Sequence, residues 1–116
     1  MAFYDKTVTI ASSGTTSAAV DTGLLSTHSK TQLVGISFPS AMTSTAMTFT
    51  AASTEAGTYT TLKEVSGGST YSITVTASSR IPFDHRVFVC APFIKCVGGS
   101  AEGAERTLTL HFREVG

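Results

Sequence analysis

Short runs of this chain alternate apolar residues with serine or threonine at a period of two. Residues 107–112 and 46–50 are two such runs, and residues 71–76 are a third. Because successive side chains of a strand point to opposite faces, each run can bury one face and expose hydroxyls on the other. No segment keeps an apolar period of 3.6 residues, so we expect almost no helix. The pattern predicts an antiparallel all-β protein.

Gly, Ser and Pro interrupt this pattern at short, regular intervals, which is typical of a sandwich or barrel. We expect one domain over residues 1–116, in which residues 1–6 can form an N-terminal arm. Two antiparallel sheets packed face to face are the natural solution for about eight or nine such strands. The expected strands are residues 6–11, 17–21, 32–38, 45–52, 58–65, 70–76, 87–90, 93–97 and 106–115.

The segment from Gln32 to Phe38 is the most apolar of these strands, so we expect it at the centre of a sheet with both faces covered. Plain alternation directs Val34 and Ile36 inward there. The predicted core collects the inward positions of all strands: Val8, Ile10, Val34, Ile36, Phe38, Met47, Phe49, Leu62, Ile73, Val75, Val87, Ile94, Leu108, Leu110 and Phe112.

Composition narrows the functions that suit this fold. Serine and threonine make up 35 of the 116 residues, while charged residues are only 14%. Eight basic and eight acidic residues cancel, so no long-range field attracts nucleic acid or an anionic membrane. No apolar run approaches the ~20 residues that span a bilayer. No signal peptide is visible either, and we expect synthesis and folding in a reducing cytosol.

Residues that could carry catalysis are scattered along the chain. Of the three histidines, His28 lies in a polar loop, His85 follows Asp84, and His111 is on the outward face of the last strand. No Gly-x-Ser-x-Gly elbow accompanies them, and the many serines fall in turns and on strand faces. Some serine–histidine proximity is expected by chance in such a sequence. We therefore expect no catalytic residues and no enzymatic activity.

The only cysteines, Cys90 and Cys96, could form a zinc site with His85 and His111. Their spacings are His-x4-Cys and Cys-x5-Cys, which lack the close pairs of structural zinc sites. We expect two buried, free thiols and no metal.

Other motifs for ligands or catalysis are equally weak. The loop at Gly98 to Ser100 is followed by neither Lys-Ser/Thr nor a helix, so we expect no phosphate-binding cofactor. Asp84, Glu64 and Glu55 are the mid-chain carboxylates available for glycoside hydrolysis, and we interpret each as a surface residue.

Two adjacent aromatic residues, Phe3 and Tyr4, stand at an N-terminus where polar residues are usual. They can dock back on the domain or anchor a neighbouring subunit. We take them as the candidate interface residues.

The order of several segments resembles the head decoration, or cement, proteins of tailed phages. The resemblance runs from about Thr7 to Arg113, and it departs from the usual Asp-Gly-Gly turn at Glu55-Ala56-Gly57 and in having cysteines at positions 90 and 96. The segments that carry it are residues 7–23, 33–39, 45–53, 57–59, 79–84, 93–95 and 106–110.

The resemblance implies a jelly-roll β-sandwich on the capsid exterior that bridges neighbouring subunits of the major capsid protein. It implies a virion protein assembled in the host cytoplasm, without cofactor, nucleic-acid or membrane partners. We also expect a homo-oligomer, with a dimer favoured over a trimer, because closed symmetric oligomers match the symmetry axes of a shell.

Two alternatives remain open. The order of strands and turns from Phe49 to Tyr59 also looks like discoidin-type carbohydrate-binding modules, which would need an exposed aromatic platform. The chain has no Trp, and its only tyrosines are Tyr4, Tyr59 and Tyr71. Such a module could act in tail-associated adhesion, and a tail or head-completion component is the third possibility.

Overall fold

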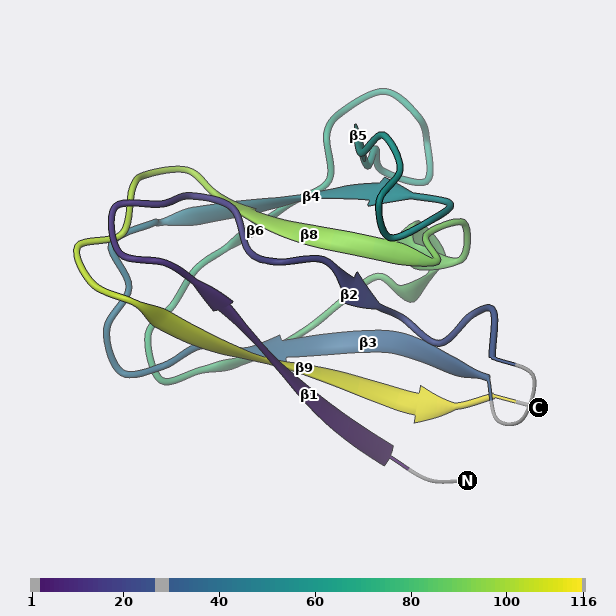
Figure 1. The fold of residues 1–116 in the computed structure, drawn as a ribbon, viewed down its shortest axis with the longest axis horizontal. Helices are drawn as coiled ribbons and strands as arrows, with labels where there is room; N and C mark the ends of the chain where they lie inside the picture. The colour runs from purple at the N-terminus through teal and green to yellow at the C-terminus, as the bar shows by residue number, and fades with distance from the viewer. Residues whose placement is uncertain (1–2, 27–29, 116) are drawn as a thin grey trace.

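Two antiparallel sheets packed face to face make up the protein, so the predicted β-sandwich is confirmed (Figure 1). The structure, a computed structural model, describes residues 3–26 and 30–115. Its elements in chain order are β1 (Phe3–Ile10), β2 (Val20–Asp21), β3 (Thr31–Ser37), β4 (Ala46–Ala52), β5 (Thr60–Thr61), β6 (Ser72–Thr74), β7 (Arg80–Pro82), the 3-10 helix η1 (His85–Phe88), β8 (Phe93–Gly98) and β9 (Arg106–Glu114).

The first sheet has the strand order β1-β9-β3-β7, and the second has the order β2-β8-β4-β5 with β6 also paired to β4. Apart from the passage through β4, β5 and β6, each strand is followed in the chain by a strand of the opposite sheet. The long strands β3 and β9 lie side by side in one layer, and β4 and β8 face them in the other (Figure 1). Whether this sandwich is of the jelly-roll type stays a prediction here.

A β-bulge in β3 sets which residues of that strand enter the core. Leu33 pairs with Phe112, but the next pair along the ladder is Gly35 with His111, so Val34 is an extra residue. The bulge lets both Leu33 and Ile36 point inward, and each is almost fully buried. The expected position of Val34 in the core is therefore wrong: Val34 is half-buried on the outer face, beside Gly35. The outer face of the sheet is hollowed at Val34 and Gly35. β3 therefore has the expected central position, between β9 and β7, but only its inner face is fully covered.

The segment expected to form a strand at residues 87–90 is instead the end of the 3-10 helix η1 followed by a turn. Asp84 caps η1 by accepting a hydrogen bond from the backbone amide of Arg86. In the helical turn the adjacent residues Val87 and Phe88 are both buried, which a strand of period two would not allow. Phe88 then joins Phe49, Tyr71 and Phe83 in an aromatic cluster with ring centroids 4.9–6.4 Å apart.

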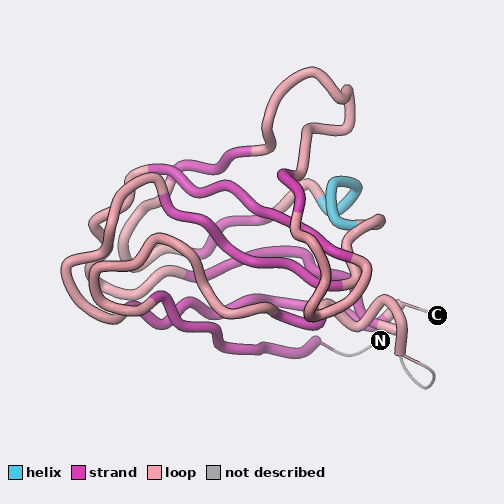
Figure 2. Tube along the Cα trace, turned by 45° about the horizontal axis from the view of Figure 1, so that its top comes forward, coloured by secondary structure: helices cyan, strands magenta, loops and turns pink. Residues whose placement is uncertain are grey.

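The other strands agree with the alternation pattern to different degrees. β1 begins at Phe3, so residues 3–6, considered above as an arm, pair with β9. β5 and β6 are much shorter than expected, and the loop between them projects from the body of the sandwich (Figure 2). Ile73 and Val75, both expected in the core, are only partly buried against it as a result.

No helix within the described residues is long and apolar enough to cross a membrane.

The bulge can be tested by comparing neighbouring substitutions. Leu33→Ala removes a buried side chain, and we expect it to lower the free energy of unfolding by ~2–5 kcal/mol. Val34→Ala should cost about 1 kcal/mol or less, because Val34 faces outward. Denaturant unfolding measures both. A larger loss for Val34→Ala than for Leu33→Ala would contradict the register described here.

Candidate functional site

Three polar side chains form a continuous row across the outer face of the first sheet. Asp5 on β1, His111 on β9 and Ser37 on β3 come from three neighbouring strands. His111 Nδ1 lies 2.7 Å from Asp5 Oδ1, and His111 Nε2 lies 2.6 Å from Ser37 Oγ. The imidazole thus links a carboxylate to a hydroxyl, one through each ring nitrogen.

The register of the sheet brings these three residues together. Asp5 is the direct cross-strand partner of His111, so their side chains share a face. Ser37 pairs with Thr109, which is two residues from His111 and faces the same way. Without the bulge at Val34, Ser37 would move by one position along β9 and turn toward the core. The bulge therefore allows one strand to bury its apolar residues and still present Ser37 to His111.

Direction of hydrogen bonding within the row follows from the groups involved. An ionised carboxylate only accepts hydrogen bonds, so His111 Nδ1–H donates to Asp5. The neutral ring then has its lone pair on Nε2, and the Ser37 hydroxyl donates to it. The His111 side chain is only 10% exposed, whereas that of Asp5 is 60% exposed. The histidine is thereby held in a fixed tautomer at the edge of solvent.

A hollow of about 290 Å³ lies next to this row on the same face. Its walls are mostly apolar, from Phe3, Val34, Ile81 and Pro82, and His111 also lines it. Gly35 opens the space: a Cβ there would come within 3.0 Å of the Ile81 carbonyl oxygen. The row and the hollow together form the candidate site, in which a serine with a histidine base lies beside an apolar cavity.

Arg80 is the positive side chain of this hollow. It pairs with Ser37 across β3 and β7, so both side chains point to the outer face. Ser37 is therefore flanked by His111 on one side and by the Arg80 position on the other. A positive group beside the hydroxyl can stabilise negative charge that develops there.

The candidate interface residues lie at the start of β1, on either side of an edge strand. Phe3 is 74% exposed on the outer face, and Tyr4 is exposed on the opposite side, where its hydroxyl donates to Glu114 Oε2 at 3.3 Å. No other described strand pairs with the far edge of β1. The structure thus leaves both aromatic rings accessible.

The cysteines lie apart from the histidine of the site. Cys96 is buried on β8 in the second sheet, while His111 faces outward from the first. Burial raises the pKa of the Cys96 thiol to about 12, although a hydrogen bond with Ser17 lowers it slightly. A thiol with so high a pKa is a poor metal ligand at neutral pH. The expectation that both thiols are buried is wrong for Cys90, which is free and exposed after η1.

The other residues that the sequence offers for catalysis or metal binding are not part of this site. Asp84 binds Arg86 at 3.1 Å, and Glu55 and Glu64 are exposed in loops. His28 lies outside the described residues, as does the side chain of His85. Among the described residues, no group of three or more His, Cys, Asp or Glu side chains is arranged to hold a metal ion.

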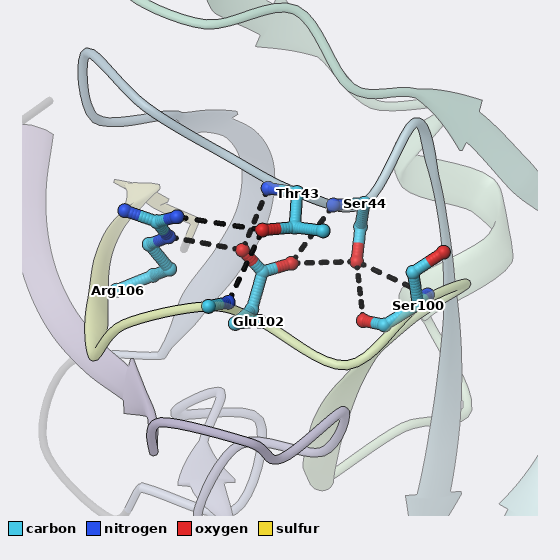
Figure 3. A network of polar contacts seen from close by, with 6 residues as sticks. Thr43, Ser44, Ser100, Glu102 and Arg106 are labelled. Atoms are coloured by element: carbon cyan, nitrogen blue, oxygen red, sulfur yellow. Dashed lines mark hydrogen bonds and ion pairs between the residues drawn. The ribbon is translucent and has the colours of Figure 1, made fainter.

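A second polar cluster, centred on Glu102, has a structural role (Figure 3). Its carboxylate is buried and accepts hydrogen bonds from the backbone amides of Thr43 and Ser44 and from the Ser44 hydroxyl, at 2.6–2.9 Å. Arg106 Nε approaches the same carboxylate at 3.0 Å. The cluster ties the loop before β4 to the loop before β9. No apolar hollow adjoins it among the described pockets.

Sequence reasoning did not identify Ser37 or Asp5 as site residues. The alternation pattern puts Asp5 just before the first expected strand, at residues 6–11, and Ser37 is one of many strand hydroxyls. These two residues could have been found only from the pairing of β1 and β3 with β9, and no local sequence pattern indicates that pairing.

Comparison of the chain with protein-family models, curated proteins and solved structures finds no match in any of the three.

The Glu102 cluster predicts a specific acid sensitivity. Burial alone would raise the pKa of Glu102, but the hydrogen bonds from Ser44, Thr43 and Arg106 outweigh it and hold the pKa at about 2, below the ordinary 4.5. A folded-state pKa below the unfolded one gives stability that is present above about pH 4.5 and is lost as pH falls toward 2. A lowering of that size corresponds to roughly 3 kcal/mol.

Unfolding of the wild type and of Glu102→Gln between pH 2 and 7 would measure this contribution. We expect Glu102→Gln to be less stable at pH 7 by ~2–4 kcal/mol and to lose most of the difference near pH 2. Glu105→Gln, which removes an exposed carboxylate nearby, controls for the loss of one negative charge. Equal destabilisation by Glu102→Gln at both ends of the range would contradict the explanation.

Proposed function

We propose that the protein is a structural virion component that binds the outside of a tailed-phage capsid and bridges neighbouring subunits of the major capsid protein. The segments that resemble phage decoration proteins are one line of support. The path of the chain is another, because the alternation of strands between the two sheets is what a jelly roll of two Greek keys would have. A dimer, favoured over a trimer, belongs to the same proposal.

The observation that carries the proposal is the edge of the first sheet at β1. Eight residues of β1 offer one edge without a strand partner among the described residues, and such an edge is a template for pairing with another chain. Phe3 and Tyr4 at its start add two exposed aromatic anchors. A capsid subunit that contributes an extended segment to this edge would gain main-chain hydrogen bonds and an apolar contact together.

The low charge of the chain fits contact with a large protein surface. Charged residues are depleted in the centres of protein interfaces, and here they are only 14% of the chain. Outward threonines such as Thr7 and Thr9 on β1 can form hydrogen bonds without the cost of burying a charge. Many copies bound around a shell would each add stability by mass action.

The carbohydrate-binding alternative has less support from the aromatic residues. Lys95 Nζ lies 4.4 Å from the ring centroid of Tyr59, so one face of this ring is already covered. Tyr71 packs in the aromatic cluster, and its hydroxyl accepts a hydrogen bond from the Asp84 amide. Tyr4 is then the tyrosine whose exposure best suits a sugar. A glycan array that shows selective binding would favour this alternative over capsid decoration.

The direct experiment is to add the purified protein to expanded, undecorated capsids of its own phage. We expect binding in a fixed copy number per shell and a raised temperature of capsid disruption. Light scattering of the free protein should give about twice the 12.1 kDa of one chain for a dimer. Absence of binding to any capsid form would overturn the proposal.

A matched pair of variants tests the assigned surface. Phe3→Ser with Tyr4→Ser removes both aromatic anchors from β1, and we expect at least a tenfold loss of capsid affinity, about 1.4 kcal/mol or more. Val89→Ser removes an equally accessible apolar residue beside η1 and should bind as the wild type does. Equal loss in both variants would show that general surface hydrophobicity, and not the β1 edge, drives binding.

A further inference from the structure

We propose that Ser37 is a nucleophile, activated by His111 and oriented through Asp5, that takes the acyl group of small esters with apolar acyl chains. This activity goes beyond the proposed structural role and does not depend on it. The site is the row Asp5–His111–Ser37 with the adjacent hollow of about 290 Å³.

The connections within the row are those that acyl transfer needs. A nucleophile requires a base within about 2.6–3.2 Å and a third group that orients the base. Here Ser37 Oγ lies 2.6 Å from Nε2 of His111, and Asp5 Oδ1 lies 2.7 Å from Nδ1. With Nδ1–H directed at Asp5, the Nε2 lone pair is available for the serine proton. After proton transfer, the carboxylate also stabilises the imidazolium.

The environment of Ser37 indicates the substrate class. The hollow bordered by Phe3, Val34, Ile81 and Pro82 offers an apolar surface for a short acyl chain. His111 and Arg80 both line it, and Ser37 contacts the first and is the strand partner of the second. Ser37 itself does not line the hollow and adjoins it through His111, so we place the acyl chain of the ester in the hollow and its carbonyl at the contact between His111 and Ser37. Arg80, as the strand partner of Ser37, brings a positive charge to this side of the hydroxyl, and we assign it to stabilise the oxyanion that forms.

The proposed reaction has two halves. Ser37 Oγ attacks the ester carbonyl carbon while its proton passes to His111 Nε2, and the carbonyl oxygen becomes an oxyanion whose charge Arg80 helps to stabilise. The intermediate collapses as the bond to the alkoxy oxygen breaks, and His111 returns the proton to the leaving alcohol. Water then attacks the acyl-serine with His111 as base, which releases the acid and restores Ser37.

A fluorophosphonate probe tests the nucleophile directly, since Oγ displaces fluoride from phosphorus to give a stable adduct. We expect peptide mass spectrometry of the labelled native protein to place the adduct on Ser37. Labelling should disappear in Ser37→Ala and slow by about 100-fold or more in His111→Gln. Ser72→Ala, which removes an exposed strand serine from the other sheet, should label at the wild-type rate.

Asp5→Asn provides a second variant, and because the Asp5 side chain is 60% exposed we expect it to fold as the wild type does. We expect at least about a tenfold slower labelling in this variant, with an unchanged unfolding temperature. With p-nitrophenyl butyrate, the wild type should release nitrophenol and carry the butyryl group on Ser37, and Ser37→Ala should do neither. Adducts on other serines alone, or equal rates in Asp5→Asn and the wild type, would overturn the proposal.

Discussion

The pairing of β9 with both β1 and β3 is the constraint on which the rest of the structure depends. One face of β9 supplies Leu108, Leu110 and Phe112 to the core, and all three are fully buried. The opposite face carries His111. Because β9 is antiparallel to both neighbours, a shift of one residue on either side would exchange core and surface for a whole strand. Burial of these three residues fixes the register of β9 with β1 and β3. The same register brings Asp5 and Ser37 next to His111 on the outer face.

The β3 bulge determines which residues of this strand are buried in the core and which lie on the outer face. It lets Leu33 and Ile36 share the buried face although three positions separate them. It also places Val34 and Gly35 together opposite His111, which leaves the outer face hollow at this point. Bulges often occur beside functional sites because they redirect side chains without ending the sheet. The bulge that allows β3 to bury Leu33 and Ile36 thus also forms the hollow of the candidate site.

Much of the fold could be predicted from alternation alone, because a strand with one buried face must repeat every two residues. The alternation predicts the strands at β1, β3, β4, β8 and β9. Prediction failed around Val87 and Phe88, where a cap at Asp84 starts a helical turn and two adjacent residues become buried. The site could not be predicted, because the contact between Ser37, His111 and Asp5 depends on strand order and register between distant segments.

The two proposed functions use different parts of the first sheet. Capsid binding is assigned to the free edge of β1, and acyl transfer to the face above β9 and β3, with Phe3 at the boundary between them. The low charge and the many hydroxyls make the protein suited to broad, shallow contacts. The row of Asp5, His111 and Ser37 is different, because it concentrates a base and a hydroxyl in one sheltered place.

The most direct test of this account is the proton position on His111, measured by nitrogen-15 NMR of the imidazole when the ring is neutral. The account predicts that Nδ1 carries the proton and donates to Asp5, while Nε2 is unprotonated and accepts from Ser37. Substitution of Ser37 by alanine should then change mainly the Nε2 resonance. A proton found on Nε2, or a ring that exchanges freely between both forms, would contradict the arrangement on which the candidate site depends.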